Sequence, residues 1–167
     1  MLALGVDPGT AITGFGLVSE TTDGKLIALD FGVIRTPQGE TAGQRLVQLY
    51  SELKRLIDLH HPESGAVEKL FFQRNVSTAL SVGQARGVAL LAMAEVNLST
   101  AEYTPMEVKQ AVCGYGGASK GQIQEMVKLL LGLDEIPKPD DAADALAVAI
   151  CHINSWKINS ISNDHNE

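Results

Sequence analysis

The chain opens with short apolar runs separated by turn residues, a pattern typical of strands. Residues 2–6 form a continuous apolar run, residues 7–10 are Asp-Pro-Gly-Thr and predict a turn, and apolar residues return over 12–18 and 26–34. Asp23-Gly24, between the last two runs, is a hairpin signal. We therefore predict that the chain begins with an antiparallel meander of three strands.

Helical spacing replaces the strand pattern in the next segment. The apolar positions on one face of this predicted helix are Leu46, Leu49, Tyr50, Leu53, Leu56 and Ile57, and Pro62 ends it. A short strand follows over residues 65–68. Because a helix connects this strand to the meander, we expect it to join the sheet by parallel pairing.

The remaining pattern predicts one more strand among four helices. The strand is expected over residues 100–103. Two of the helices are expected to begin at a serine cap: one runs from Ser77 to about Asn97 and the other from Ser119 to Leu131. The other two run from Pro105 to Val112 and from Asp140 to Trp156. This order gives an α/β fold: a five-stranded mixed sheet, an antiparallel meander plus parallel strands, with helices on both faces. It is the layout of the RNase H-like fold. We assign residues 1–156 to one domain and residues 157–167 to a frayed tail.

Composition narrows the class of protein. Hydrophobic residues make up 45% and charged residues 20% of the 167 residues, which suffices for one buried core. The apolar stretches are too short to span a bilayer, and we find no export signal. Cys113 and Cys151 lack the spacing of a metal site, so we interpret them as free thiols of a cytoplasmic protein.

Charge is unevenly distributed along the chain. The net charge is −7, but residues 1–68 carry 5 basic and 9 acidic side chains (−4), residues 69–128 carry 6 and 4 (+2), and residues 129–167 carry 2 and 7 (−5). A phosphate-binding surface needs a local positive patch, because distant charges are screened. The middle segment is the place for such a patch, although the charge pattern alone fits an acidic protein without nucleic-acid binding better.

Four acidic residues are placed where the predicted fold brings them together. Asp7 follows the first strand, Glu68 ends the fourth, and Asp141 and Asp144 share a face at the start of the last helix, with only alanines between them. Taken singly, each has an ordinary interpretation as a turn residue, a solvated strand end or an acid at a helix N-terminus. Clustered carboxylates repel one another unless a cation neutralises them, so the set predicts a site for Mg²⁺ or Mn²⁺, with two ions.

Motifs along the chain, all in the same order, resemble the bacterial RuvC family of Holliday-junction resolvases, the crossover junction endodeoxyribonucleases. The motifs are Leu4-Gly5-Val6-Asp7-Pro8-Gly9-Thr10 with Thr13-Gly14-Phe15-Gly16, Val67-Glu68 with Phe71-Phe72 and Asn75, Gly83-Gln84-Ala85-Arg86-Gly87, Val108-Lys109-Gln110 with Gly114 and Lys120, and Asp141-Ala142-Ala143-Asp144-Ala145-Leu146-Ala147. They cover about residues 1–153. The opening motif is shared with the actin and sugar-kinase superfamily and with YqgF nucleases, whereas the Gly-Gln-Ala-Arg-Gly and Asp-Ala-Ala-Asp blocks are more specific.

The resemblance implies a homodimeric, divalent-metal-dependent endonuclease of DNA recombination and repair. Such an enzyme hydrolyses phosphodiesters symmetrically in two strands of a four-way DNA junction, leaves 5′-phosphate ends, and works with the RuvA–RuvB branch-migration complex. The implied catalytic metal ligands are Asp7, Glu68, Asp141 and Asp144. The implied DNA contacts are Phe71, as the aromatic that wedges into the junction, Lys109 and Lys120.

Further DNA contacts are expected beside these residues. Phe71 and Phe72 fall in a predicted loop, where one ring is expected to be anchored and the other to stack on an unpaired base. Burial of both rings in the core is an equally weighted alternative. Arg74 and Arg86 complete the predicted DNA-binding set.

Two glycines and two lysines add expectations about assembly and phosphate contact. Gly83 and Gly87 lie inside a predicted helix, where each costs about 1 kcal/mol relative to Ala. Close packing across a dimer two-fold would offset that cost, so this helix is the expected interface. Lys109 and Lys120 flank a glycine loop and are placed to reach phosphates, although a solvated helix face is usually the safer interpretation of such lysines.

Three other functions fit parts of the sequence. An ATP-dependent phosphotransferase would share the Asp-x-Gly-Thr turn, but such enzymes need a second domain, for which 167 residues are too few. A YqgF-type RNA nuclease has a shorter chain and does not explain the Gly-Gln-Ala-Arg-Gly helix. A third alternative is a catalytically silent module that only binds junctions. The four acids argue against it, because such a module would bind polyanionic DNA more tightly without them.

Overall fold

The computed structural model describes residues 1–69 and 76–164, which form five strands and five helices. The strands are β1 (Leu2–Asp7), β2 (Ile12–Glu20), β3 (Leu26–Arg35), β4 (Ser64–Glu68) and β5 (Ser99–Tyr103). The helices are α1 (Ala42–His60), α2 (Val76–Ala94), α3 (Pro105–Cys113), α4 (Lys120–Leu130) and α5 (Asp140–Asp164). Within these residues no helix is both long and apolar enough to cross a membrane.

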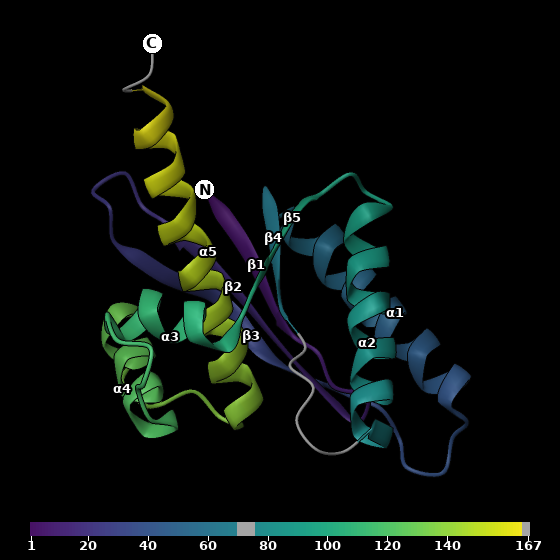
Figure 1. Cartoon of the computed structure of the whole chain (residues 1–167). Coiled ribbons are helices and arrows are strands. Elements are labelled where there is room, and N and C mark those ends of the chain that lie inside the picture. Colours follow the sequence, from purple (N-terminus) through teal and green to yellow (C-terminus); the bar gives the residue numbers. More distant parts are fainter. Residues whose placement is uncertain (70–75, 165–167) are drawn as a thin grey trace.

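The strands form one mixed sheet in the order β3-β2-β1-β4-β5 (Figure 1). β1, β2 and β3 pair antiparallel as a meander, whereas β4 pairs parallel with both β1 and β5. The parallel register sets Val6 opposite Val67. The residues that follow them, Asp7 and Glu68, therefore leave the sheet at the same edge. The predicted α/β fold with a five-stranded mixed sheet is confirmed.

Helices cover both faces of the sheet, and each face has its own apolar core (Figure 1). α1 and α2 cover one face, where leucines of the strands meet leucines of α1 and alanines of α2. α5 crosses the other face, with α3 and α4 packed against it, and its core is rich in alanine. Because two helical layers enclose the sheet, its central strands are buried on both sides.

Local capping explains where several helices begin and end. Ser119 caps α4, since its side chain accepts a hydrogen bond from the backbone N–H of Gln122. α1 ends at His60, and His61 adopts a left-handed backbone with φ 48° as its C-cap. Both features agree with the sequence prediction.

Two predicted helices have wrong ends. α2 begins at Val76, so Ser77 lies inside the helix instead of capping it, and the helix ends at Ala94 rather than near Asn97. α5 continues to Asp164, so residues 157–164, expected as a frayed tail, are helical. An ion pair between Lys157 and Glu20 of β2 ties this extension to the sheet.

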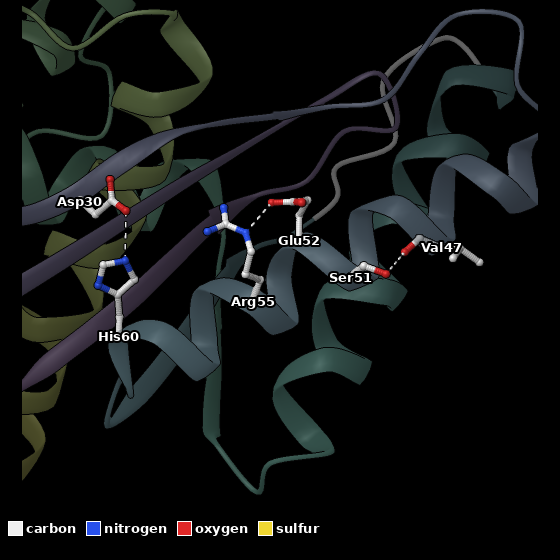
Figure 2. Close-up of polar contacts among 6 residues, drawn as sticks. All are labelled: Asp30, Val47, Ser51, Glu52, Arg55 and His60. Carbon is white, nitrogen blue, oxygen red and sulfur yellow. Dashed lines mark hydrogen bonds and ion pairs between the residues drawn. The ribbon is translucent and has the colours of Figure 1, made fainter.

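Polar contacts line the exposed side of α1 and join its end to β3 (Figure 2). His60 Nε2 lies 3.0 Å from Asp30 Oδ2 on β3, and Arg55 Nε donates to Glu52 Oε2 at 2.9 Å. Surface pairs of this kind contribute about 0–1 kcal/mol each. The buried apolar side of α1 therefore contributes more to holding this helix on the sheet than its polar side.

Candidate active site

Two strand ends bring Asp7 and Glu68 together at one edge of the sheet. Asp7 is the last residue of β1 and Glu68 the last of β4, directly after the paired residues Val6 and Val67. Their side chains share a hydrogen bond. The parallel pairing of β1 and β4 thus places both acids at the carboxyl ends of neighbouring strands, where open α/β sheets bind ligands.

α5 lies directly on the backbone of β1 and β2 at a glycine track formed by Gly5, Gly14 and Gly16. A Cβ atom on Gly14 would lie 1.9 Å from the Asp141 carbonyl oxygen, and one on Gly5 would lie 2.2 Å from the Ala145 carbonyl oxygen. Cβ atoms do not approach carbonyl oxygens this closely, so only glycine fits at both positions. The glycine track therefore fixes the height of α5 above the sheet.

The same contact places the first turns of α5 beside the end of β1. Gly14 pairs with Asp7 in the β1–β2 ladder and touches α5 at Asp141. The negative charge of Asp144, three residues further along the helix, acts on both Asp7 and Glu68. The structure thus brings all four predicted acids to one edge of the sheet.

Desolvation dominates the electrostatics of this acid cluster. Desolvation is the largest cause that raises the pKa of Asp7, the charges of Glu68, Asp144 and Asp141 add to it and Lys120 opposes it, and together they set this pKa at about 8. Desolvation likewise raises the pKa of Glu68 and the pKa of Asp144. Ionising these carboxylates therefore costs free energy in the metal-free protein. A bound cation would lower that cost, because it neutralises their negative charge.

Lys120, the first residue of α4, lies across the start of α5. Its Nζ is 3.1 Å from Asp140 Oδ2 and 3.3 Å from Asp144 Oδ2. Asp140 also accepts a hydrogen bond from Gln124 Nε2 at 3.0 Å. The ammonium group is thus held by α5 itself and partly neutralises the acid cluster.

A cleft of about 240 Å³ is lined by two of the four acids and by two lysines. Glu68 and Asp144 line it together with Lys109 of α3 and Lys120 of α4. Both lysines act on Glu68 and lower its pKa, against the larger effect of desolvation. A cleft that holds carboxylates beside ammonium groups suits a phosphodiester, since the first can bind metal and the second can attract phosphate oxygens.

The donor atoms of the cluster suit a hard divalent cation. All are carboxylate oxygens, the ligands that Mg²⁺ prefers, on side chains that are desolvated and repel one another. As the side chains stand, no group of three or more His, Cys, Asp or Glu within residues 1–69 and 76–164 is gathered closely enough to hold a metal ion. In this arrangement the Asp144 carboxylate forms an ion pair with Lys120.

The other predicted DNA contacts are placed differently. Arg86 forms an ion pair with Glu102 of β5, and its Nε is buried with no hydrogen-bond partner in the described part of the chain. This side chain is engaged within the protein and does not line the cleft. Phe71, Phe72 and Arg74 lie outside the described residues, so the predicted aromatic wedge stays a prediction.

Relatives of known identity match nearly the whole chain. The family model described as "Crossover junction endodeoxyribonuclease RuvC" matches residues 3–152. The enzyme of that name from Chloroflexus aurantiacus is 59% identical over 152 residues, which cover 91% of this chain and 92% of that protein. The one from Moorella thermoacetica is also 59% identical, over 91% of this chain and 90% of its own.

Solved structures agree with the sequence comparison. The structure of Thermus thermophilus RuvC has a TM-score of 0.89 and 36% identity, covering 95% of this chain and 97% of that one. T. thermophilus RuvC in complex with Holliday junction substrate has a TM-score of 0.86 and 34% identity, covering 95% and 96%. These matches confirm the resemblance seen in the motifs and set aside the phosphotransferase and YqgF alternatives. The chain belongs to the RuvC family of crossover junction endodeoxyribonucleases.

Proposed function

We propose that this endonuclease resolves four-way DNA junctions by hydrolysing phosphodiesters symmetrically in two strands, with Asp7, Glu68, Asp141 and Asp144 as its catalytic metal ligands. The observation that carries the proposal is the desolvated acid cluster at the sheet edge, which shares a cleft with two lysines. The cofactor is Mg²⁺ or Mn²⁺, with two ions in each site. Release of 5′-phosphate ends, a cytoplasmic location and cooperation with the RuvA–RuvB complex belong to the same proposal and rest on the resemblance.

The protein's own groups divide the work of hydrolysis. Divalent cations held by the carboxylates would supply an activated water and neutralise charge on the leaving oxygen. The glycine track fixes where Asp141 and Asp144 meet Asp7 and Glu68. Lys109 and Lys120 line the same cleft, and each can hold a phosphate oxygen. If Asp144 bound a metal ion, the Lys120 ammonium would keep only Asp140 as a carboxylate partner and could then also contact a phosphate oxygen.

The exposed face of α2 supports a homodimer. Leu80 and Leu91 are 66% and 54% exposed, and a Cβ atom on Gly87 would meet nothing within 4 Å. Packing among residues 1–69 and 76–164 therefore gives no reason for a glycine that costs about 1 kcal/mol in a helix. Two copies of α2 related by a two-fold axis would bury this face and bring two sites to one junction.

Cleavage of matched DNA substrates tests the catalytic assignment. A mobile four-way junction and a linear duplex of related sequence are incubated with enzyme in Mg²⁺ or in EDTA. We expect paired nicks in the junction alone, and only in Mg²⁺. Asp7→Asn should bind the junction without cutting it, whereas Asp58→Asn, at an exposed position on α1, should cut normally. Cleavage by Asp7→Asn above a trace would contradict the assignment.

Sedimentation tests the dimer separately. Leu91→Glu places a charge on the exposed face of α2 and should shift the protein from dimer to monomer. Leu129→Glu is the matched control, because Leu129 is similarly exposed but lies on α4. A wild-type protein that stays monomeric both alone and on the junction contradicts the proposed assembly.

A further inference from the structure

A hydroxyl group connects the turn after Asp7 to a distant helix. Thr10 Oγ1 donates a hydrogen bond of 2.7 Å to the backbone carbonyl oxygen of Ser81 in α2, 71 positions along the chain. We propose that Thr10 is a positioning residue for cleavage, whose hydroxyl holds the Asp7 turn in place against α2. The inference rests on the proposed function, because it takes Asp7 as a metal ligand.

The turn itself is closed by Thr13 and behaves as one unit. Thr13 Oγ1 donates to the Gly9 carbonyl oxygen at 2.5 Å and accepts from the Gly9 N–H at 3.2 Å. A Cβ atom on Gly9 would lie 2.2 Å from the Ile12 carbonyl oxygen, so the backbone is tightly folded here. Because its interior is fixed, the placement of this turn depends on contacts from outside it.

Thr10 makes those outside contacts on two sides. Its carbonyl oxygen accepts a hydrogen bond of 2.7 Å from Thr36 Oγ1, which follows β3 and itself accepts from Arg45 Nε of α1 at 2.8 Å. Its hydroxyl donates in the opposite direction, to Ser81 of α2. Thr10 therefore lies in the middle of a chain of hydrogen bonds that runs from α1 through the turn to α2.

This position matters because Asp7 and Glu68 leave the sheet on different segments. Asp7 continues into the turn, whereas the segment after Glu68 leads into α2. The Thr10 hydroxyl therefore connects the turn that follows Asp7 to α2, the helix that follows Glu68 along the chain. Threonine suits the task, since its β-branched side chain has few χ1 rotamers and directs the hydroxyl with little loss of entropy. Without this bond the strands stay paired and Thr36 still holds the turn from the side of β3, but the turn loses its anchor on α2. A shift of about 1 Å at a catalytic group can cost about 100-fold in rate.

Single-turnover cleavage of a four-way junction across a Mg²⁺ titration tests the proposal. Thr10→Val keeps the shape of the side chain and removes the donor, whereas Thr10→Ser keeps the donor. For Thr10→Val we expect the Mg²⁺ concentration at half-maximal rate to rise and the rate at saturating Mg²⁺ to fall. The product of these two changes should be about five- to tenfold, which corresponds to the loss of one hydrogen bond. Thr10→Ser should behave as wild type. Thr21→Val is the matched control, because Thr21 lies in the hairpin between β2 and β3.

Several outcomes separate a positioning role from a structural one. Junction affinity in EDTA should be the same for all variants, since Thr10 is proposed to act on the metal ligand and not on DNA. Wild-type rate and Mg²⁺ dependence in Thr10→Val overturn the proposal, and so do equal defects in Thr10→Val and Thr10→Ser. If Thr10→Val does not fold, as judged by circular dichroism, Thr10→Ala removes the same donor and carries the same expectation.

The Asp7→Asn variant distinguishes this inference from the function on which it rests. If Asp7→Asn cuts the junction, Asp7 is not an essential ligand and the proposed function fails. If Asp7→Asn is inactive while Thr10→Val is fully active, only the role of Thr10 fails.

Discussion

The two faces of the sheet are packed in different ways, and only one of them is covered by the helix that carries two of the proposed metal ligands, Asp141 and Asp144. Towards α1 and α2, large side chains such as Leu4, Leu17 and Leu53 fill the space between helix and sheet. Towards α5 the helix backbone touches the strand backbone at the glycine track. The first arrangement buries apolar surface and tolerates small adjustments. The second buries less side-chain surface but fixes the position of α5 on the sheet. Acids that come from separate elements need such a fixed position if they are to meet at one site.

Filling the glycine track should have the largest effect on activity. In Gly14→Ala the new methyl group would lie 1.9 Å from the Asp141 carbonyl oxygen, so α5 has to move away from β2. We expect cleavage to fall by about 100-fold or more, because displacements of about 1 Å have that cost. Junction cleavage assays measure the loss. Gly43→Ala is the control, since a Cβ there meets nothing within 4 Å. Near-normal cleavage by Gly14→Ala would remove the distinction between the two faces.

Truncation on the opposite face should affect stability and leave chemistry intact. Leu53 of α1 is fully buried on the side of the helix that packs into the core, so Leu53→Ala should lower the free energy of unfolding by about 2–5 kcal/mol. Cleavage per folded molecule should equal that of wild type, because no acid is positioned through Leu53. Urea denaturation gives the stability, and an assay at a temperature where the variant is folded gives the activity. A specific loss of rate in the folded variant would mean that the leucine face also positions the site.

Removing one acid should stabilise the metal-free protein. The pKa of Asp7 is raised to about 8 in the fold, so the stability that this carboxyl contributes is full below its unfolded pKa and is lost as pH rises towards 8. At neutral pH in EDTA, Asp7→Asn should therefore raise the free energy of unfolding by roughly 1–3 kcal/mol. The gain should shrink as pH falls towards about 4, where Asp7 becomes protonated in the unfolded chain as well as in the folded protein. Thermal melts across pH test this, and an unchanged or lower melting temperature at neutral pH would contradict it.

The smallest predicted effect concerns His152, on the α5 face but remote from the acids. Its ring is 3% exposed and has Nδ1 3.0 Å from the Tyr103 hydroxyl, and desolvation lowers its pKa. The neutral ring fits the fold, so the stability it contributes is present above the unfolded pKa of about 6.5 and is lost as pH falls through the lower folded pKa. Between about pH 7.5 and about pH 5, wild type should lose more stability than His152→Gln, by about 1 kcal/mol. Identical pH slopes would show that His152 does not titrate differently in the two states.

Patterns that are local in the sequence predicted the sheet and the meeting of the acids. Apolar runs closed by turn residues predicted β1, β2 and β3, and the helix before β4 predicted the parallel pairing that sets Asp7 beside Glu68. The spacing of Asp141 and Asp144 predicted one shared helix face. These predictions succeeded because side-chain periodicity and short right-handed connections leave few alternative arrangements.

Contacts between distant segments could not be predicted in the same way. In the sequence, Gly5 and Gly14 are glycines of separate strands, and only the β1–β2 register places them under one helix. Gly14 and Gly16, two positions apart on one face of β2, were nevertheless a usable signal. Lys120 was expected to contact DNA, but its ion pairs with Asp140 and Asp144 depend on how α4 packs against α5. Such side-chain pairings are set by tertiary packing, which local propensity does not determine.

The order of the elements along the chain has a consequence for biosynthesis. Asp7 leaves the ribosome before Glu68, which can lie beside it only after β4 has paired with β1. Half of the proposed ligands arrive with α5, which must still dock on the glycine track. Because domains fold as units once their long-range contacts are available, a nascent chain that ends before α5 carries no complete set of the proposed ligands. A growing chain is therefore expected to be unable to cut DNA until α5 has emerged and docked.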